Sequence, residues 1–76
     1  MMSAIEKAVD ALLGQTATAK ALGGGVTQTQ VWNWVHRHQQ APAKYIKRIS
    51  ELTHGSVTVD ELLADHEKGR KGEKHG

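Results

Sequence analysis

Apolar residues recur along the chain at intervals of three and four positions, the spacing that places them on one face of an α-helix. The first such stripe lies in residues 4–13 and is expected to face the core; it comprises Ile5, Val9, Leu12 and Leu13. Ser3 and Glu6 have the spacing of a capping box at its start. Gly14 suits the position that follows a helix end. The pattern therefore predicts a first helix over residues 4–13.

The next part of the chain predicts two helices separated by glycines. Residues 15–22 are rich in alanine and are expected to form a short second helix that a neighbouring helix can approach closely. Gly23, Gly24 and Gly25 follow it, and consecutive glycines favour turns with positive φ over helix. Thr27 is a suitable N-cap, so a third helix is predicted over residues 28–38.

A fourth helix is expected to begin at Pro42, which suits the first helical position, and to end at Gly55. Its predicted inner face comprises Tyr45, Ile46, Ile49 and Leu52. Lys44, Lys47 and Arg48 occupy the opposite face. The pattern again indicates an amphipathic helix.

The last helix is expected to be short and to begin with a second capping box, formed by Thr58 and Glu61. Leu62 and Leu63 are predicted to face inward, and a brief strand over residues 57–59 is the alternative. Residues 67–76 contain no large apolar side chain, so they are predicted to form a disordered basic tail. We therefore predict an all-α protein, a compact bundle of about five short helices, with one folded domain over residues 1–66.

Composition adds limits to this picture. The chain has 76 residues, no cysteine and a net charge of +2, which suits one small domain without disulfides or thiolate metal ligands. The N-terminal sequence lacks the features of a signal peptide, and no apolar run approaches the ~20 residues of a membrane helix. We therefore expect a cytoplasmic protein without a membrane partner.

The charges are unevenly distributed. Residues 11–50 contain only basic charges, whereas residues 51–67 contain only acidic ones. A basic block creates a local positive field that attracts polyanions such as nucleic acids. Chance clustering of charges on solvated faces is the alternative interpretation.

The most informative segment is the helix over residues 15–22, the glycine turn and the helix over residues 28–38, which together match a helix-turn-helix. In that motif the second helix enters the DNA major groove. A helical wheel places Val31, Trp34, Val35 and His38 on the side of the core together with Thr27. The outward side presents the expected base-contacting residues, namely Gln28, Thr29, Trp32, Asn33 and His36.

These outward residue types suit base recognition, because Asn and Gln can pair with adenine and Thr can contact a base edge or a thymine methyl. An ordinary polar helix face is the alternative. For Trp32 we expect partial burial within the domain first, then contact with another protein, then contact with DNA.

Contacts to DNA phosphates are expected from residues near this helix. The candidates are Gln15 and Thr16, near the start of the second helix, together with Arg37, Lys44, Lys47 and Arg48. Helix N-termini and basic side chains both bind phosphate. A solvated basic face is the alternative for the four charged residues.

Catalysis is not predicted. His36 and His38 are two positions apart and point away from each other on a helix, and no nucleophile–base pair has a plausible spacing. The glycines are not followed by the residues of a phosphate-binding loop. We therefore expect no enzyme activity, no metal and no cofactor.

At this point the sequence resembles the Cro/repressor-like helix-turn-helix regulators of bacteria and phages, and it is most similar to the small Cro and YdaS-type antitoxin group. The resemblance is carried by residues 15–23 and 26–34, by Pro42 with Ala43, and by residues 49–58. It implies a lambda-repressor-like helix-turn-helix domain. By the same resemblance Gln28, Thr29 and Asn33 contact bases and Gln15 contacts phosphate, whereas Ala19, Gly23, Val31 and Trp34 are structural.

The sequence departs from the pattern in two respects. The glycine turn holds two extra residues, which either change the angle between the helices or bulge outward. Thr18 replaces the usual leucine and Trp32 replaces a polar residue. We hypothesise that Trp32 covers the gap left near Thr18.

The leading functional prediction is a sequence-specific transcriptional repressor. It is expected to bind a double-stranded DNA operator as a homodimer on an inverted repeat, with half-sites about 34 Å apart. The main competing prediction is an antitoxin or other protein-interaction module, with a toxin as its partner. A third possibility is a nucleoid or RNA-binding protein without sequence preference.

Overall fold

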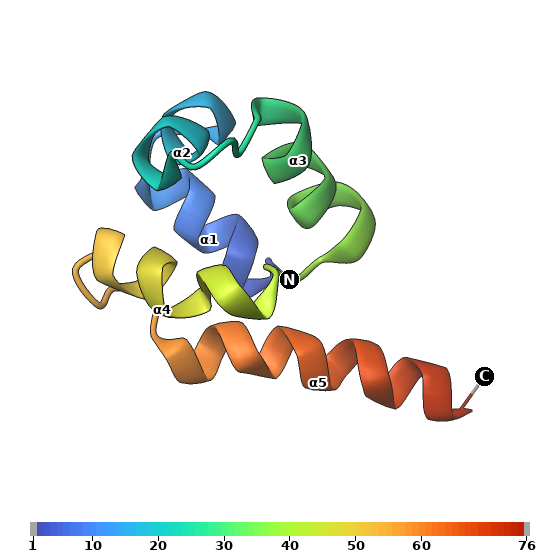
Figure 1. Ribbon diagram of the computed structural model, residues 1–76. Helices are drawn as coiled ribbons and strands as arrows, with labels where there is room; N and C mark the ends of the chain where they lie inside the picture. Colours follow the sequence, from blue (N-terminus) through green and yellow to red (C-terminus); the bar gives the residue numbers. More distant parts are fainter. Residues whose placement is uncertain (1, 76) are drawn as a thin grey trace.

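The computed structural model describes the backbone of residues 2–75 and the side chains of residues 2–68. Within this part helices joined by short turns and loops are the only regular elements, and no strand occurs, which confirms the all-α prediction and excludes the strand considered over residues 57–59. The elements, in chain order, are α1 Ala4–Ala11, α2 Gln15–Leu22, α3 Gln28–Asn33, the π-helical η1 Trp34–His38, α4 Ala43–Leu52 and α5 Val59–His75 (Figure 1).

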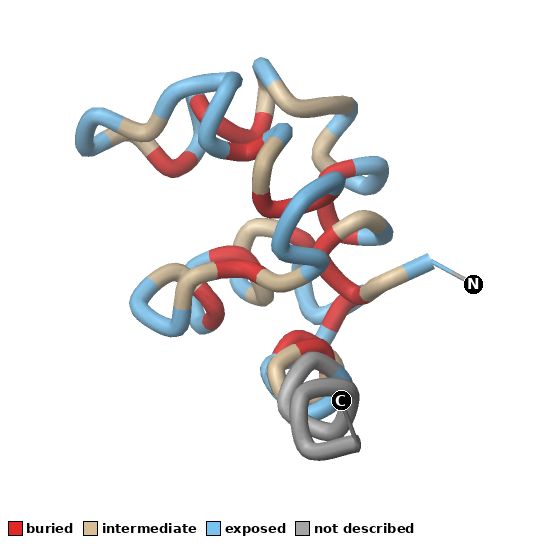
Figure 2. The backbone as a smooth tube through the Cα atoms, turned by 90° about the vertical axis from the view of Figure 1, so that its right-hand side faces the viewer, coloured by how far each residue is buried: buried red, intermediate tan, exposed pale blue. Residues whose placement is uncertain are grey.

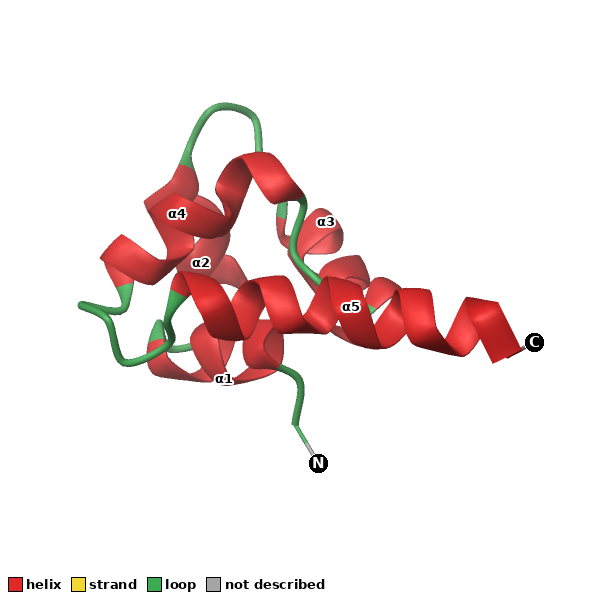
Figure 3. Ribbon diagram, turned by 90° about the horizontal axis from the view of Figure 1, so that it is seen from below, coloured by secondary structure: helices red, strands yellow, loops and turns green. Residues whose placement is uncertain are grey.

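The helices surround a single core. α1 packs against α2, η1 and α5, α2 packs against α3, and α4 packs against both α2 and α5. α5 lies across the side of the bundle opposite α2 and α3 (Figures 1 and 3). The largest fully buried apolar side chains are Ile5, Val31, Ile49 and Leu62, one from each of four helices. The buried positions alternate along the backbone with exposed ones (Figure 2), as expected for short amphipathic helices.

The end of α1 differs from the sequence prediction. The helix ends at Ala11, and Leu13 adopts a left-handed conformation with φ +71°. The amide of Leu13 donates to the carbonyl of Asp10 and that of Gly14 to the carbonyl of Val9, at 3.1 and 2.9 Å. This Schellman arrangement satisfies the last carbonyls of the helix and reverses the chain. Leu13 consequently points outward and is 88% exposed, so its predicted place in the core is wrong.

The end of α4 repeats this arrangement. His54 has φ +56°, its amide donates to the carbonyl of Glu51, and the amide of Gly55 donates to the carbonyl of Ser50. The beginning of α4 also shifts by one residue, because Pro42 has extended geometry and precedes the helix rather than opening it. The predicted inner face is confirmed. Ile46 and Ile49 are buried, and Tyr45 and Leu52 are partly buried against the core.

The capping box at the start of α5 is confirmed. The Thr58 amide donates to the Glu61 carboxylate at 3.0 Å, and the Glu61 amide donates to the Thr58 hydroxyl at 3.1 Å. Leu62 is fully buried as predicted, but Leu63 is 45% exposed. Adjacent residues on a helix lie about 100° apart, and because Leu62 and Asp65 take the inward positions, Leu63 faces outward.

α5 is longer than predicted, since its backbone remains helical to His75. It therefore includes residues 67–75, which belong to the segment 67–76 that the composition predicts as a disordered tail. The side chains of residues 69–76 lie outside the described part, so the domain boundary at residue 66 stays a prediction. Within the described part, His66 donates through Nε2 to the carbonyl of Ala41 at 2.6 Å and so ties α5 to the loop before α4.

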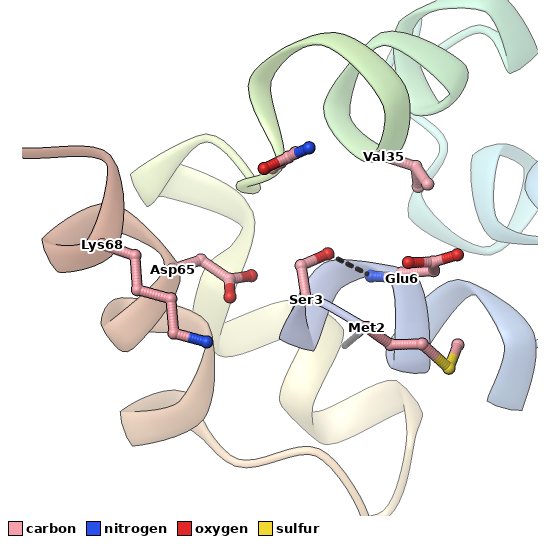
Figure 4. Close-up of a pocket in the computed structure, with 7 residues that line it drawn as sticks. Met2, Ser3, Glu6, Val35, Asp65 and Lys68 are labelled. Carbon is pink, nitrogen blue, oxygen red and sulfur yellow. Dashed lines mark hydrogen bonds between the residues drawn. The ribbon is translucent and has the colours of Figure 1, made fainter. Parts of the chain in front are cut away.

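The start of α1 is capped from two directions. The Ser3 hydroxyl accepts from the Glu6 amide at 3.2 Å (Figure 4), which is half of the predicted capping box. No described hydrogen bond joins the Glu6 carboxylate to the Ser3 amide. Instead, the amides of Ala4 and Ile5 donate to the buried carboxylate of Asp65, each at 3.0 Å.

Candidate nucleic-acid interface

α2 and α3 pack against each other through small and branched side chains. Ala19 and Leu22 of α2 and Val31 of α3 are buried in the core that they share with α1. Thr18 is fully buried as well, and its hydroxyl donates to the carbonyl of Gly14 at 2.8 Å. That bond satisfies the hydroxyl within the interior, and the hypothesis that Trp32 covers the gap near Thr18 stays a prediction.

The turn between α2 and α3 uses all three glycines. Gly23, Gly24 and Gly25 have φ values of +63°, +59° and +86°. No atom lies within 4 Å of the position that a Cβ would take at any of them, so conformation rather than space requires glycine here. The amide of Val26 donates to the carbonyl of Gly23 at 3.1 Å, and Val26 packs against the core. Gly24 and Gly25 are exposed, so the middle of the turn lies at the surface, and the effect of the two extra residues on the angle between the helices stays a prediction.

Thr27 begins α3 as predicted, but it does so as an exposed N-cap and not as part of the core. Its hydroxyl accepts from the Gln30 amide at 3.2 Å, and its own amide donates to Gln30 Oε1 at 3.0 Å. This reciprocal box was missed in the sequence, although the Thr-x-x-Gln spacing is its known signal. Gln30 is consequently engaged at the start of the helix.

The predicted third helix changes character at Trp34. The segment Trp34–His38 is π-helical, and Gln39 follows with φ +54°. The inward positions of Val31, Trp34 and Val35 are confirmed, and the Trp34 ring lies 5.5 Å from that of Tyr45. His38, predicted on the same side, is exposed. The 100° step of an α-helix no longer applies in the wider π turn, so the wheel fails at its last position.

The outward face of this helix carries the predicted base-contacting residues. Gln28, Thr29, Trp32 and His36 are exposed, and Asn33 is half-buried. Gln28, Trp32 and His36 follow one another at intervals of four, which places them in one row along the helix surface. The Trp32 and His36 rings are 4.5 Å apart and inclined by 36°.

Gln28 also connects this face to α2. Its Nε2 donates to Gln15 Oε1 at 2.7 Å, across the glycine turn. Gln15 is half-buried and Thr16 is exposed at the start of α2. The N-cap of that helix is Gly14, which forms no side-chain cap, so no capping side chain covers the first-turn amides.

The remaining predicted phosphate contacts are exposed but come from two other elements. Arg37 belongs to η1, whereas Lys44, Lys47 and Arg48 belong to α4, which packs on α2 and α5. The Lys44 ammonium lies 5.2 Å from the centre of the Tyr45 ring. The structure thus links Gln15 to Gln28 by a hydrogen bond and brings the rings of Trp32 and His36 together. The four basic side chains belong to η1 and α4 and not to α3.

A concave region lies away from this face, between α1, η1 and α5 (Figure 4). Its lining includes Met2, Ser3, Glu6, Val35, Asp65 and Lys68. Asp65, the most buried charged group there, already accepts the two α1 amides, so its role is structural. Residues 2–68 contain no cluster of three or more side chains able to hold a metal ion. None of the described helices has the length and apolar character needed to cross a membrane.

Comparison with known proteins identifies one family. The family model described as bacterial toxin YdaS matches residues 5–71, which is most of the chain. This match confirms the YdaS-type group indicated by the sequence, and its description names a toxin, whereas the resemblance is to an antitoxin group. Searches of curated proteins and of solved structures gave no match.

Proposed function

The chain belongs to the family described as bacterial toxin YdaS, and from this premise we propose that it is a sequence-specific DNA-binding regulator. α3 and η1 enter the major groove, and α2 lies across the phosphate backbone, as in a helix-turn-helix. The regulator acts as a repressor and binds as a dimer on an inverted repeat, because a single small module rarely supplies enough affinity. A cytoplasmic location follows from a DNA target in a bacterial cell.

The hydrogen bond between Gln28 and Gln15 is the observation that carries this proposal. It fixes the side chain at the first position of α3 and joins it to the helix that faces the phosphates. Gln28 keeps its Oε1 and one N–H for a base, which is the pair of groups that recognises adenine. A preorganised side chain loses less conformational entropy on binding.

The surroundings of this face favour a polyanion. The first-turn amides of α2 are not covered by a cap, and helix N-termini attract phosphate. Residues 11–50 carry five basic side chains and no acidic one, namely Lys20, Arg37, Lys44, Lys47 and Arg48. Such charges supply affinity and salt dependence, while the polar row on α3 supplies sequence choice.

Selection of bound duplexes from a randomised DNA pool at near-physiological salt tests the proposal. We expect an inverted repeat whose half-sites are about one helical turn apart. Binding without a consensus, and fading as salt rises, contradicts it, because only electrostatic attraction then remains.

The family description supports a second candidate function, a module of a toxin–antitoxin pair that binds protein through the same exposed face. The fold is unchanged in this case, but the outward residues of α3 contact a protein partner. A tight complex with a partner protein that Asn33→Ala weakens, together with the absence of a DNA consensus, distinguishes this function from the first.

A further inference from the structure

Trp32 is an exposed indole in an otherwise polar row. Its side chain is 41% exposed, and its neighbours one turn away on the helix surface are Gln28 and His36. This exposed fraction agrees with the partial burial within the domain that the sequence leads us to expect first, and it leaves part of the ring open to solvent. Tryptophan is enriched at interfaces, so an exposed indole among groups able to contact bases is a candidate contact for a partner.

The indole is held by its neighbour. The ring of His36 lies 4.5 Å from that of Trp32 at an inclination of 36°, a separation typical of stacked aromatic pairs. Trp32 also has few rotatable bonds, so little side-chain entropy is lost when it is covered. The pair therefore presents a preformed apolar surface one helical turn beyond Gln28.

The charge of the surrounding chain indicates what covers this surface. η1 carries Arg37 between His36 and His38, and no acidic residue occurs between positions 11 and 50. This arrangement complements the DNA phosphates. Within the major groove, the 5-methyl group of thymine is the apolar group exposed on a base edge.

We propose that Trp32, positioned by His36, contacts the thymine 5-methyl group at one base pair of each half-site. The inference rests on the proposed function and deepens it, because it assigns the apolar part of sequence recognition to a residue that replaces a polar one in the pattern. Gln28 selects adenine through hydrogen bonds, and Trp32 selects thymine through burial of its methyl group.

The test uses duplexes recovered from the randomised pool. Each thymine of the consensus is replaced in turn by deoxyuridine, which removes only the methyl group and keeps every hydrogen-bonding atom. Wild-type protein should lose about three- to tenfold in affinity at one position per half-site, consistent with removal of one buried methyl. Trp32→Ala should bind thymine and uracil duplexes equally.

Two variants control for indirect effects. Trp32→Phe keeps an aromatic surface and should retain part of the thymine preference. Leu63→Ala removes an exposed apolar side chain from α5 and should leave the preference unchanged. Circular dichroism and thermal unfolding confirm that each variant is folded.

A recovered consensus that wild-type protein binds equally well with uracil overturns this inference and leaves the proposed function standing. A thymine preference that persists in Trp32→Ala also overturns the inference alone. So does a Trp32→Ala variant that loses the same affinity for every duplex while the thymine preference is unchanged. Absence of any consensus overturns both, and a protein contact that needs Trp32 then becomes the explanation for its exposure.

Discussion

Asp65 on α5 accepts a hydrogen bond from the backbone amide of Ile5, 60 positions earlier in the chain, at 3.0 Å. Its other carboxylate oxygen accepts from the amide of Ala4 at the same distance. The first amides of a helix have no partner within it, and a negative charge there is favoured by the helix dipole. A single side chain thus caps α1 and fastens the C-terminal helix to the N-terminal one.

Replacing Asp65 by alanine should destabilise the protein by about 2 kcal/mol, because two buried amides lose a charged acceptor. Asp65→Asn should have a smaller effect, since one oxygen remains to accept. Urea denaturation followed by circular dichroism measures both. Asp60→Asn is the matched control at an exposed position of α5, and a loss as large as that of Asp65→Ala there would contradict the proposed role.

The capping box of α5 predicts a dependence on acid pH. Hydrogen bonds from the backbone amide and from the hydroxyl of Thr58, helped by the charge of Lys7, hold the pKa of the Glu61 carboxyl below its usual range. The folded pKa is then lower than the unfolded one. The stabilisation is complete above the unfolded value, about 4.3 for glutamate, and is lost as pH falls through the folded pKa.

Glu61→Gln removes the charge of the carboxylate but keeps a side-chain oxygen that can accept the capping hydrogen bond. Gln30 already completes a capping box with Thr27, so glutamine at position 61 should also accept from the Thr58 amide. The variant should remain folded at neutral pH and lose less stability than the wild type between about pH 5 and pH 3. Thermal unfolding across this range is the measurement, and parallel curves for both proteins would refute the prediction.

The left-handed residue after α1 predicts a stabilising substitution. Leu13 has φ +71°, and its side chain is almost fully exposed. Glycine removes the strain of this conformation, about 1–2 kcal/mol for an L-residue, against a smaller entropy cost in the unfolded chain. Leu13→Gly should therefore raise the free energy of unfolding by about 0.5–1 kcal/mol.

His54→Gly is the matched substitution at the end of α4, where φ is +56°, and it should act in the same direction. Denaturant unfolding of both variants checks the expectation. A clear loss of stability in Leu13→Gly would show that the leucine side chain contributes contacts that outweigh its backbone strain.

Two substitutions at proposed DNA contacts, one on α3 and one on α4, should differ in kind. Asn33→Ala should cost about 1–3 kcal/mol of discrimination between the consensus and a substituted site. Arg48→Ala should weaken binding to all sequences and reduce the slope of affinity against salt, because a phosphate contact releases counterions. Binding isotherms on both duplexes at several salt concentrations separate these effects. If the two variants lose the same discrimination, the division between base and phosphate contacts is wrong.

The sequence by itself determined the positions of most helices and their inner faces. Apolar spacing located Ile46 and Ile49 in the core, and the Thr58 and Glu61 capping box marked the start of α5. These features depend on local periodicity and on bonds between residues three or four positions apart. The polar outward row on α3 was predictable for the same reason.

Only the tertiary structure decided which contacts are made between distant segments and how the helices end. Asp65 accepts hydrogen bonds from amides of α1, and Gln28 donates to Gln15. No local sequence pattern predicts that these residues lie close together. The left-handed exit at Leu13 and the π turn before His38 changed which side chains face outward. Both changes follow from the path that the backbone takes around the common core. A helical wheel assumes a fixed angle per residue and therefore cannot predict that path.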